Sequence, residues 1–287
     1  MPDPRPAQAA EREARQAAPD DWLETFARVG YAAKGVVYTV VGVLAVQAAF
    51  GSGGQTTGSK GALQEIASQS FGQILLGLTA LGLACYGIWR LILATLDPKD
   101  KGTDAEGVVK RIGYAVSGLV NLGLAMWAAR IVMQTGGGGG GSGSGSKQAM
   151  TAKLMSQPYG LWLVGIVGAI IVGVGLYHFY KAYRAKFMEK YKAGEMNRTE
   201  RKWAKRIGQW GLSARGVTFA MIGVFFVQAA LTANPSQAKG LGGAFRTLQQ
   251  QSYGPWLLGL VAAGFVCYGV YCFSYARYRR FQTQTAV

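Results

Sequence analysis

Six long stretches of apolar residues, separated by polar segments, dominate the pattern of this chain. Each stretch is long enough to cross a bilayer, since a membrane-spanning helix needs about 20 largely apolar residues. Transmembrane β-strands need only about 10 residues of alternating polarity, so the pattern favours helices. The predicted spans are Val29–Phe50, Phe71–Leu96, Ile112–Met133, Tyr159–Ala182, Trp210–Thr232 and Tyr253–Ala276.

Two short motifs recur at the beginnings of these stretches. The odd-numbered spans begin with related segments at residues 28–36, 111–119 and 209–217, and the even-numbered spans follow Gln-Ser-Phe-Gly, Gln-Pro-Tyr-Gly and Gln-Ser-Tyr-Gly. A repeat identifies the structural unit, which here is two helices and a loop. The sequence therefore predicts an all-α, polytopic membrane protein. Its six transmembrane helices form three tandem helical-hairpin repeats in an approximate three-fold bundle.

The repeats divide the chain into segments. A Gly/Ser-rich loop within the second repeat is expected to be a flexible coil on the far side of the membrane. The predicted segments are an N-terminal tail (1–24), repeat 1 (25–98), repeat 2 (99–183, with the Gly/Ser-rich loop at 135–146), a basic loop (184–206), repeat 3 (207–278) and a C-terminal tail (279–287).

Composition and charge support this class. Of the 287 residues 50% are hydrophobic and only 15% are charged, whereas about 25% is usual for soluble domains. The net charge of +16 would also suit a nucleic-acid-binding protein. However, Lys and Arg gather in the two tails and in the second and fourth loops, which is the pattern of membrane orientation. We therefore expect a multi-pass membrane protein with both termini in the cytoplasm, and no nucleic-acid partner.

The fourth loop is the most basic segment, with ten Lys and Arg residues between Lys181 and Arg206. We expect two short helices separated at Gly194, the second begun by a capping box of Asn197 and Glu200. Aromatic side chains alternate with the cations, which suits a surface that lies on the bilayer and contacts anionic phospholipid headgroups. The sequence indicates no particular protein partner. The aromatic residues are Phe187, Tyr191 and Trp203.

Cationic side chains inside the predicted spans are candidate functional residues, because such groups are costly in lipid. Lys34 and Arg215 occupy one aligned position of the odd-numbered spans, and Arg90 and His178 one position of the even-numbered spans. No predicted span contains Asp or Glu, so neighbouring cations repel unless an anion or water separates them. Lys34, Arg90, His178 and Arg215 are therefore predicted to contact either an anion or lipid headgroups, and their nearness to helix ends favours headgroups.

Other chemistry is not indicated. The single histidine has no carboxylate near it in the sequence, and the three cysteines show no Cys-x-x-Cys spacing. The spans contain no paired carboxylates and no nucleophile with a base and an orienting group. We therefore predict no metal, no cofactor, no catalytic residue and no enzymatic activity.

Glycines recur every five residues in two of the even-numbered spans, at 72, 77, 82 and 87 and at 254, 259, 264 and 269. Five residues turn a helix by about 140° beyond one full revolution, since each residue turns it by about 100°. These glycines therefore do not form a single Gly-x-x-x-Gly stripe. They predict that each of these two even-numbered helices lies between two close neighbours.

The repeated motifs resemble those of a bacterial membrane family known as domain of unknown function 1206, which also carries three tandem two-span units. The resemblance covers Thr25–Tyr278, and the second copy departs from it in its Gly/Ser loop and in Asn121. It implies an integral membrane protein of bacteria, which we expect in the cytoplasmic (inner) membrane, and no established reaction, ligand or functional residue. From the residues we predict a non-enzymatic scaffold, sensor or partner-binding protein. The alternative is a passive channel or carrier for an anion or small solute.

Overall fold

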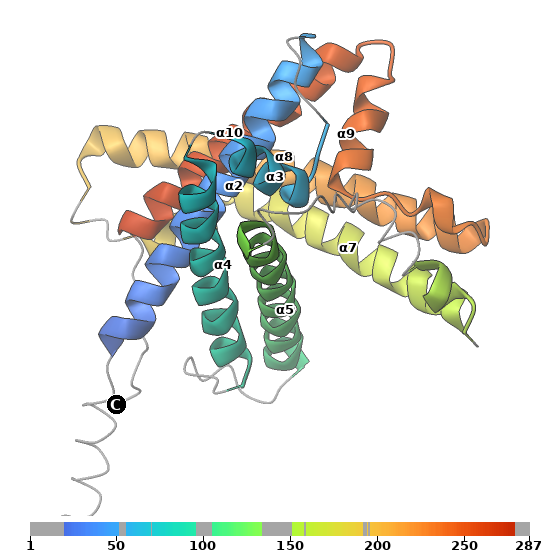
Figure 1. Cartoon of the computed structure of the whole chain (residues 1–287), viewed down its shortest axis with the longest axis horizontal. Coiled ribbons are helices and arrows are strands. Elements are labelled where there is room, and N and C mark those ends of the chain that lie inside the picture. Colours follow the sequence, from blue (N-terminus) through green and yellow to red (C-terminus); the bar gives the residue numbers. More distant parts are fainter. Residues whose placement is uncertain are drawn as a thin grey trace, which may run out of the picture.

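A computed structural model shows an all-helical chain (Figure 1). It describes residues 20–51, 56–69, 71–95, 105–133, 151–157, 159–191, 194 and 196–278. The Gly/Ser-rich loop, the C-terminal tail and most of the N-terminal tail lie outside these residues. The long helices are α2 (Asp20–Ala49), α4 (Gly72–Thr95), α5 (Ala105–Met133), α7 (Gly160–Tyr183), α8 (Arg198–Leu231) and α10 (Gly254–Tyr278).

Each of these six helices covers one predicted span except for at most one residue at either end, and each is long and apolar enough to cross a membrane. The prediction of a six-span, all-α membrane protein built from repeats is therefore confirmed. The structure adds three short elements within the loops that the sequence pattern had not indicated, α3 (Ser59–Ser68), α9 (Leu241–Gln249) and the 3-10 turn η3 (Pro235–Gln237). In the fourth loop, where the first of two short helices was expected, the chain forms the 3-10 helix η1 (Lys186–Lys190).

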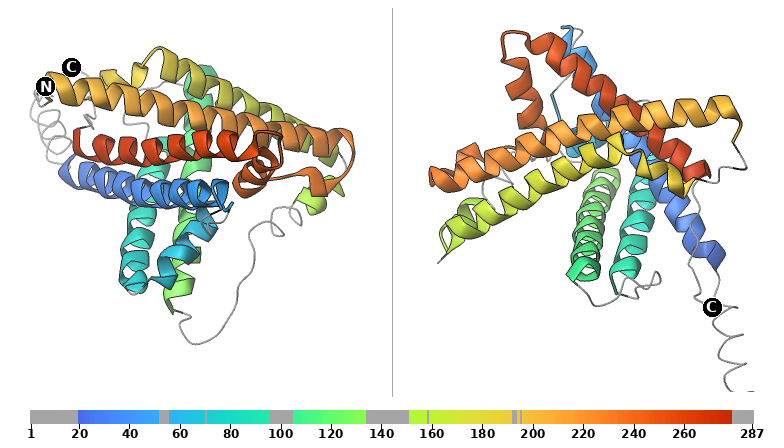
Figure 2. Two further views of the ribbon diagram at one scale, coloured as in Figure 1. Left: turned by 90° about the horizontal axis from the view of Figure 1, so that it is seen from above. Right: turned by 180° about the vertical axis from the view of Figure 1, so that it is seen from behind.

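The most extensive helix packing joins each repeat to the next one. Helices α4 and α5, α7 and α8, and α10 and α2 form three antiparallel pairs, and the last pair joins the end of the chain to its beginning. Packing within a hairpin is less extensive in repeats 1 and 3. Figure 2 (left) shows α2, α10 and α8 side by side, with α4 and α5 running across them. The unit of packing is therefore the inter-repeat pair rather than the hairpin.

Glycines at equivalent positions allow the three pairs to approach closely. A Cβ atom added to Gly175 of α7 would lie 2.9 Å from the carbonyl oxygen of Gly216 on α8. The equivalent distances are 3.1 Å from Gly87 to the carbonyl oxygen of Gly118 and 2.9 Å from Gly269 to that of Gly35. Small residues at helix interfaces in membranes increase van der Waals contact between backbones. The repeat places such residues at the interface of all three helix pairs.

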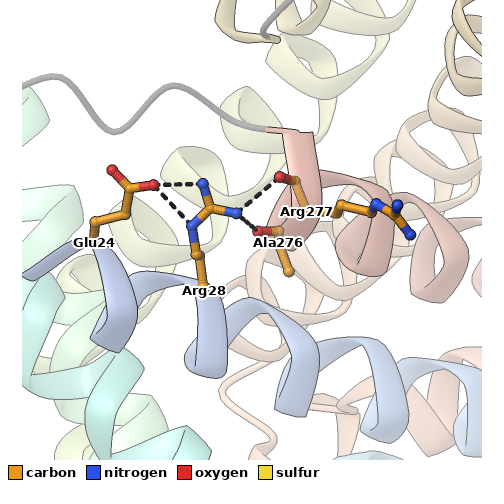
Figure 3. A network of polar contacts seen from close by, with 4 residues as sticks. All are labelled: Glu24, Arg28, Ala276 and Arg277. Atoms are coloured by element: carbon orange, nitrogen blue, oxygen red, sulfur yellow. Dashed lines mark hydrogen bonds and ion pairs between the residues drawn. The ribbon is translucent and has the colours of Figure 1, made fainter. Parts of the chain in front are cut away.

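A polar side chain of the odd-numbered helix also caps the end of its partner in each pair. Arg28 on α2 donates to the carbonyl oxygens of Ala276 (2.9 Å) and Arg277 (2.8 Å) on α10, while Glu24 holds its guanidinium by an ion pair (Figure 3). Arg111 donates in the same way to Ala94 on α4, and Gln209 to Ala182 on α7. These carbonyls have no partner within their own helices, and a cation there also complements the helix dipole.

The contacts arrange the helices in an incomplete ring in the order α2, α4, α5, α7, α8, α10. The ring is interrupted between α5 and α7, the two helices of repeat 2, which lack the packing that α2 shares with α4 and α8 with α10. The predicted approximate three-fold arrangement is therefore not confirmed.

The interruption has a cause in the sequence. In repeat 1 the helices meet where Gly82 would place a Cβ 2.5 Å from Ala33, and in repeat 3 where Gly264 would place one 2.3 Å from Ala214. Both positions carry larger residues in repeat 2, Val116 on α5 and Ile170 on α7. These two side chains are 56% and 60% exposed. Branched side chains in place of glycine and alanine prevent the same close approach.

The contacts of these glycines confirm that α4 and α10 each lie between two close neighbours. Gly82 lies against Ala33 of α2, whereas Gly87, five residues on, lies against Leu122 of α5. In α10 the glycines likewise face different neighbours, with Gly264 against α8 and Gly269 against α2. The five-residue spacing therefore places a helix between two partners.

The fourth loop differs from its prediction in two ways. Asn197 and Glu200 form the predicted capping box, with hydrogen bonds of 2.8 and 3.0 Å. However, the helix that they begin is not short, because it continues into the fifth span as the single helix α8. Phe187 and Tyr191 do not face the bilayer: both are buried against α10, and only Trp203 is exposed. Burial against the apolar interior of the bundle is therefore more favourable for these two rings than a position at the membrane–water interface.

The buried core has two parts. One is largely aliphatic and contains Leu76, Leu258 and Val41 together with residues of α3 and α9. The other is aromatic and contains Tyr31, Tyr86, Trp89 and residues of η1. The second part lies at the end of the bundle where α4, α7 and α10 finish, which we call the basic end.

Candidate functional site

Three cations from three helices lie close together within the aromatic part of the core. Lys34 comes from α2, Arg90 from α4 and Arg215 from α8. Lys34 contacts one tyrosine ring together with Arg90 and another together with Arg215. We call these three residues and the tyrosines that contact them, Tyr38, Tyr86, Tyr114 and Tyr268, the cation–tyrosine cluster.

Tyr86 lies between two of the cations. The Nζ atom of Lys34 is 4.2 Å from the centre of its ring, and the Cζ atom of Arg90 is 5.1 Å from it. Arg90 Nε also donates a hydrogen bond of 2.8 Å to the Tyr86 hydroxyl. On its other side Arg90 lies 5.0 Å from the ring of Tyr114 on α5. The ring faces stabilise both cations by cation–π attraction.

Tyr38 links Lys34 to the third cation. Its ring centre lies 5.9 Å from Lys34 Nζ and 5.2 Å from the Cζ atom of Arg215. Because Arg215 belongs to α8 and Tyr38 to α2, this contact spans helices that are not neighbours in the ring. Arg215 also donates a hydrogen bond to the Tyr268 hydroxyl and lies 4.5 Å from the centre of that ring. The three cations therefore point into the interior of the ring.

The positive charge of this cluster is not balanced within the described part of the chain. Lys34 is only 7% exposed, and among the described residues its ammonium has ring contacts but no carboxylate partner. The Nε atom of Arg215 is buried and has no hydrogen-bond partner among them. Burying a charge is costly unless it is paired and hydrogen-bonded, and cation–π attraction offsets only part of that cost. An anion would satisfy these donors.

His178 lies at the edge of this cluster rather than within it. Its Nδ1 donates to the carbonyl oxygen of Val174, 2.8 Å away in its own helix. Its ring stacks on Phe219 at 5.5 Å, and Phe219 in turn contacts Arg215, whose Cζ atom lies 5.0 Å from its centre. The structure therefore brings together three of the four predicted residues, and joins the fourth to them through Phe219.

A series of aromatic rings covers the cluster at the basic end. Tyr268 contacts Tyr271, which packs against Phe187 of η1 at 5.4 Å, and Tyr275 packs against Tyr191 at 5.4 Å. Phe187 is completely buried. The fourth loop therefore closes the bundle over the cluster.

Sequence reasoning missed the tyrosines, although a signal for them was present. Tyr38, Tyr86 and Phe219 each lie four residues from one of the cations in the same helix, and residues four apart are neighbours on a helix surface. Tyr268 has no such relation to Arg215, because the two lie on different helices. Only the packing of α8 against α10 brings them together.

The helices, the repeats and the cluster define a multi-pass helical membrane protein with an unbalanced cationic site in its interior. The chain belongs to the family described as Domain of Unknown Function (DUF1206), whose model matches it three times, at residues 29–97, 112–185 and 210–279. It is 35% identical to the Uncharacterized protein YxxB of Bacillus subtilis (strain 168) over 250 residues, which cover 87% of this chain and 89% of that protein. No solved structure matches the chain.

Proposed function

We propose that this protein is a non-enzymatic membrane protein that binds an anion in the cation–tyrosine cluster and acts as a sensor or partner-binding protein. The observation that carries the proposal is the buried, unbalanced charge of Lys34 beside Arg90 and Arg215. Hydroxyl groups of tyrosines and guanidinium groups supply the hydrogen-bond donors that such an anion needs. An inorganic oxyanion such as phosphate is a suitable probe for this site.

Passage of a solute through the bundle is less well supported. The cluster occupies only the half of the bundle toward the basic end, and the other half is packed with aliphatic side chains such as Leu76, Leu258 and Val41. A pathway for an anion would have to cross that apolar half, where a charge is strongly disfavoured. The position of the site therefore favours binding over permeation.

Thermal unfolding of the purified protein in detergent tests anion binding. With phosphate or sulfate replacing gluconate at constant ionic strength, we expect stabilisation of about 2.7 kcal/mol at a ligand concentration 100 times the dissociation constant. A variant with Arg90→Met and Arg215→Met should lose this response. A variant with Arg201→Met, at an exposed position of α8, is the control and should keep it. Equal stabilisation of the wild type and the Arg90/Arg215 variant would contradict the proposal.

We further propose that the protein lies in the bacterial cytoplasmic membrane with the basic end in the cytoplasm. The fourth loop would then contact anionic phospholipid headgroups with exposed cations such as Arg184 and Lys186. The three native cysteines, Cys85, Cys267 and Cys272, are replaced by serine or alanine before orientation is measured.

Single cysteines introduced at Lys153→Cys and Arg201→Cys, both exposed, then report the orientation. In intact cells a membrane-impermeant maleimide should label position 153 and leave position 201 unlabelled until the membrane is permeabilised. The opposite labelling pattern would show that the basic end faces outward and would overturn the proposed orientation.

A further inference from the structure

We propose that the anion bound by the cation–tyrosine cluster is the headgroup of an anionic phospholipid, which reaches the cluster from the bilayer between α5 and α7. This inference rests on the proposed anion site and names its ligand. Its first support is the interrupted ring: α5 and α7 do not share the packing that joins the two helices of the other hairpins.

The two sides of the interruption lie next to the cations. Arg90 contacts the ring of Tyr114, which belongs to α5, at 5.0 Å. Arg215 contacts Phe219 at 5.0 Å, and Phe219 stacks on His178 of α7. The two guanidinium groups therefore adjoin the helices on either side of the interruption, and Lys34 shares a tyrosine ring with each of them.

The surfaces of α5 and α7 suit acyl chains. Both carry exposed apolar side chains over several turns, and a hydrophobic ligand tail buries such surface favourably. These residues are Val116, Leu119 and Val120 on α5 and Ile166, Ile170 and Val174 on α7. Asn121 of α5, in contrast, is buried, and its amide donates to Ser117 of its own helix.

The combination of charge and apolar surface identifies the class of ligand. A small inorganic anion would use only the cations, and a neutral lipid would use only the apolar faces. A molecule with a negatively charged headgroup and acyl chains satisfies both, with the headgroup inside the ring and the chains between α5 and α7. Phosphatidylglycerol is a suitable probe, because its headgroup carries a single phosphate charge.

Reconstitution of the protein in nanodiscs distinguishes binding of a phospholipid headgroup from binding of free phosphate. In phosphatidylcholine nanodiscs, we expect added phosphatidylglycerol to raise the unfolding temperature at a concentration at least tenfold lower than inorganic phosphate requires. Lys34→Met should remove both effects. A variant of the basic loop with Arg201→Met and Lys202→Met, both at exposed positions, should keep them.

A phosphatidylglycerol with a photoreactive acyl chain provides the second measurement. It should label peptides of α5 and α7 in the wild type, and Lys34→Met should reduce that labelling to the level given by a photoreactive phosphatidylcholine. Stabilisation by phosphate without any advantage of phosphatidylglycerol would overturn this inference and leave the anion site intact. Loss of the lipid effect in the loop variant alone would also overturn it, since the headgroup would then bind at the surface. A response to neither ligand would refute both proposals.

Discussion

Replacing Gly175 by leucine is expected to separate α7 from α8 and to destabilise the protein severely. A Cβ atom at this position would lie 2.7 Å from the backbone nitrogen of Ala220 and 2.9 Å from the carbonyl oxygen of Gly216. Both atoms belong to the backbone of α8, so no side-chain rotation relieves the contact. Overpacking commonly costs 1–3 kcal/mol, and because leucine adds four heavy atoms against a fixed backbone we expect a loss of about 3 kcal/mol or more.

The same helix provides a matched control for this substitution. Gly173 lies two residues away in α7, and a Cβ atom there would meet nothing within 4 Å. Gly173→Leu makes the same change in composition and helix propensity, so it should leave the unfolding temperature nearly unchanged. Thermal unfolding and size-exclusion chromatography in detergent compare the two. If both variants were equally stable, the close packing of α7 on α8 would be wrong.

The number of spans and their class could be predicted from the sequence because length and apolarity determine them physically. A bilayer requires about 20 apolar residues of any helix that crosses it, and the six stretches satisfied this requirement without reference to their partners. The glycine spacing similarly predicted that α4 and α10 each lie between two neighbours, since the angle between successive glycines is a property of one helix. Each of these predictions depended on local geometry alone.

The choice of partners could not be predicted in the same way. The written repeat suggested a hairpin as the packing unit, whereas the structure packs α4 on α5, α7 on α8 and α10 on α2 most extensively. A seven-residue spacing of small residues, as between Gly35 and Gly42 or between Gly216 and Gly223, marks the faces of these pairs. It does not say which two faces meet, because every repeat carries a similar one.

The candidate site could likewise be predicted only in part, because some of its contacts depend on which helices pack together. The sequence identified Lys34, Arg90 and Arg215 as costly groups within spans that contain no acid. It did not indicate that Tyr38 lies between Lys34 and Arg215, because that contact joins α2 to α8 across the ring. Nearness to helix ends had favoured lipid headgroups at the membrane surface. The structure instead directs the Lys34 side chain onto the buried ring of Tyr86.

Replacing Lys34 by methionine is expected to stabilise the protein when no anion is bound. Lys34 is buried and within electrostatic range of Arg90 and Arg215, so its charge is both desolvated and repelled. Methionine keeps much of the length and flexibility of the side chain and removes the charge. Replacing even buried ion pairs by apolar residues of similar volume is often neutral or stabilising by about 1–4 kcal/mol in other proteins, and Lys34 has no carboxylate partner among the described residues. We expect a gain in this range in a buffer whose anion is gluconate.

Addition of phosphate should make the wild type more stable than Lys34→Met, which reverses their order of stability in gluconate. The wild type gains stability in proportion to the logarithm of the ligand concentration above the dissociation constant, whereas Lys34→Met lacks a central cation of the site and should gain little. Lys153→Met, at an exposed position, is the control and should follow the wild type in both buffers. The unfolding temperatures of the two proteins, plotted against phosphate concentration, should therefore cross. Such a crossing would show that the charge of Lys34 is retained for a ligand at the expense of stability. If Lys34→Met were instead less stable than the wild type in gluconate, the ring faces of Tyr86 and Tyr38 would balance the ammonium by themselves, and the buried charge would no longer require an anion.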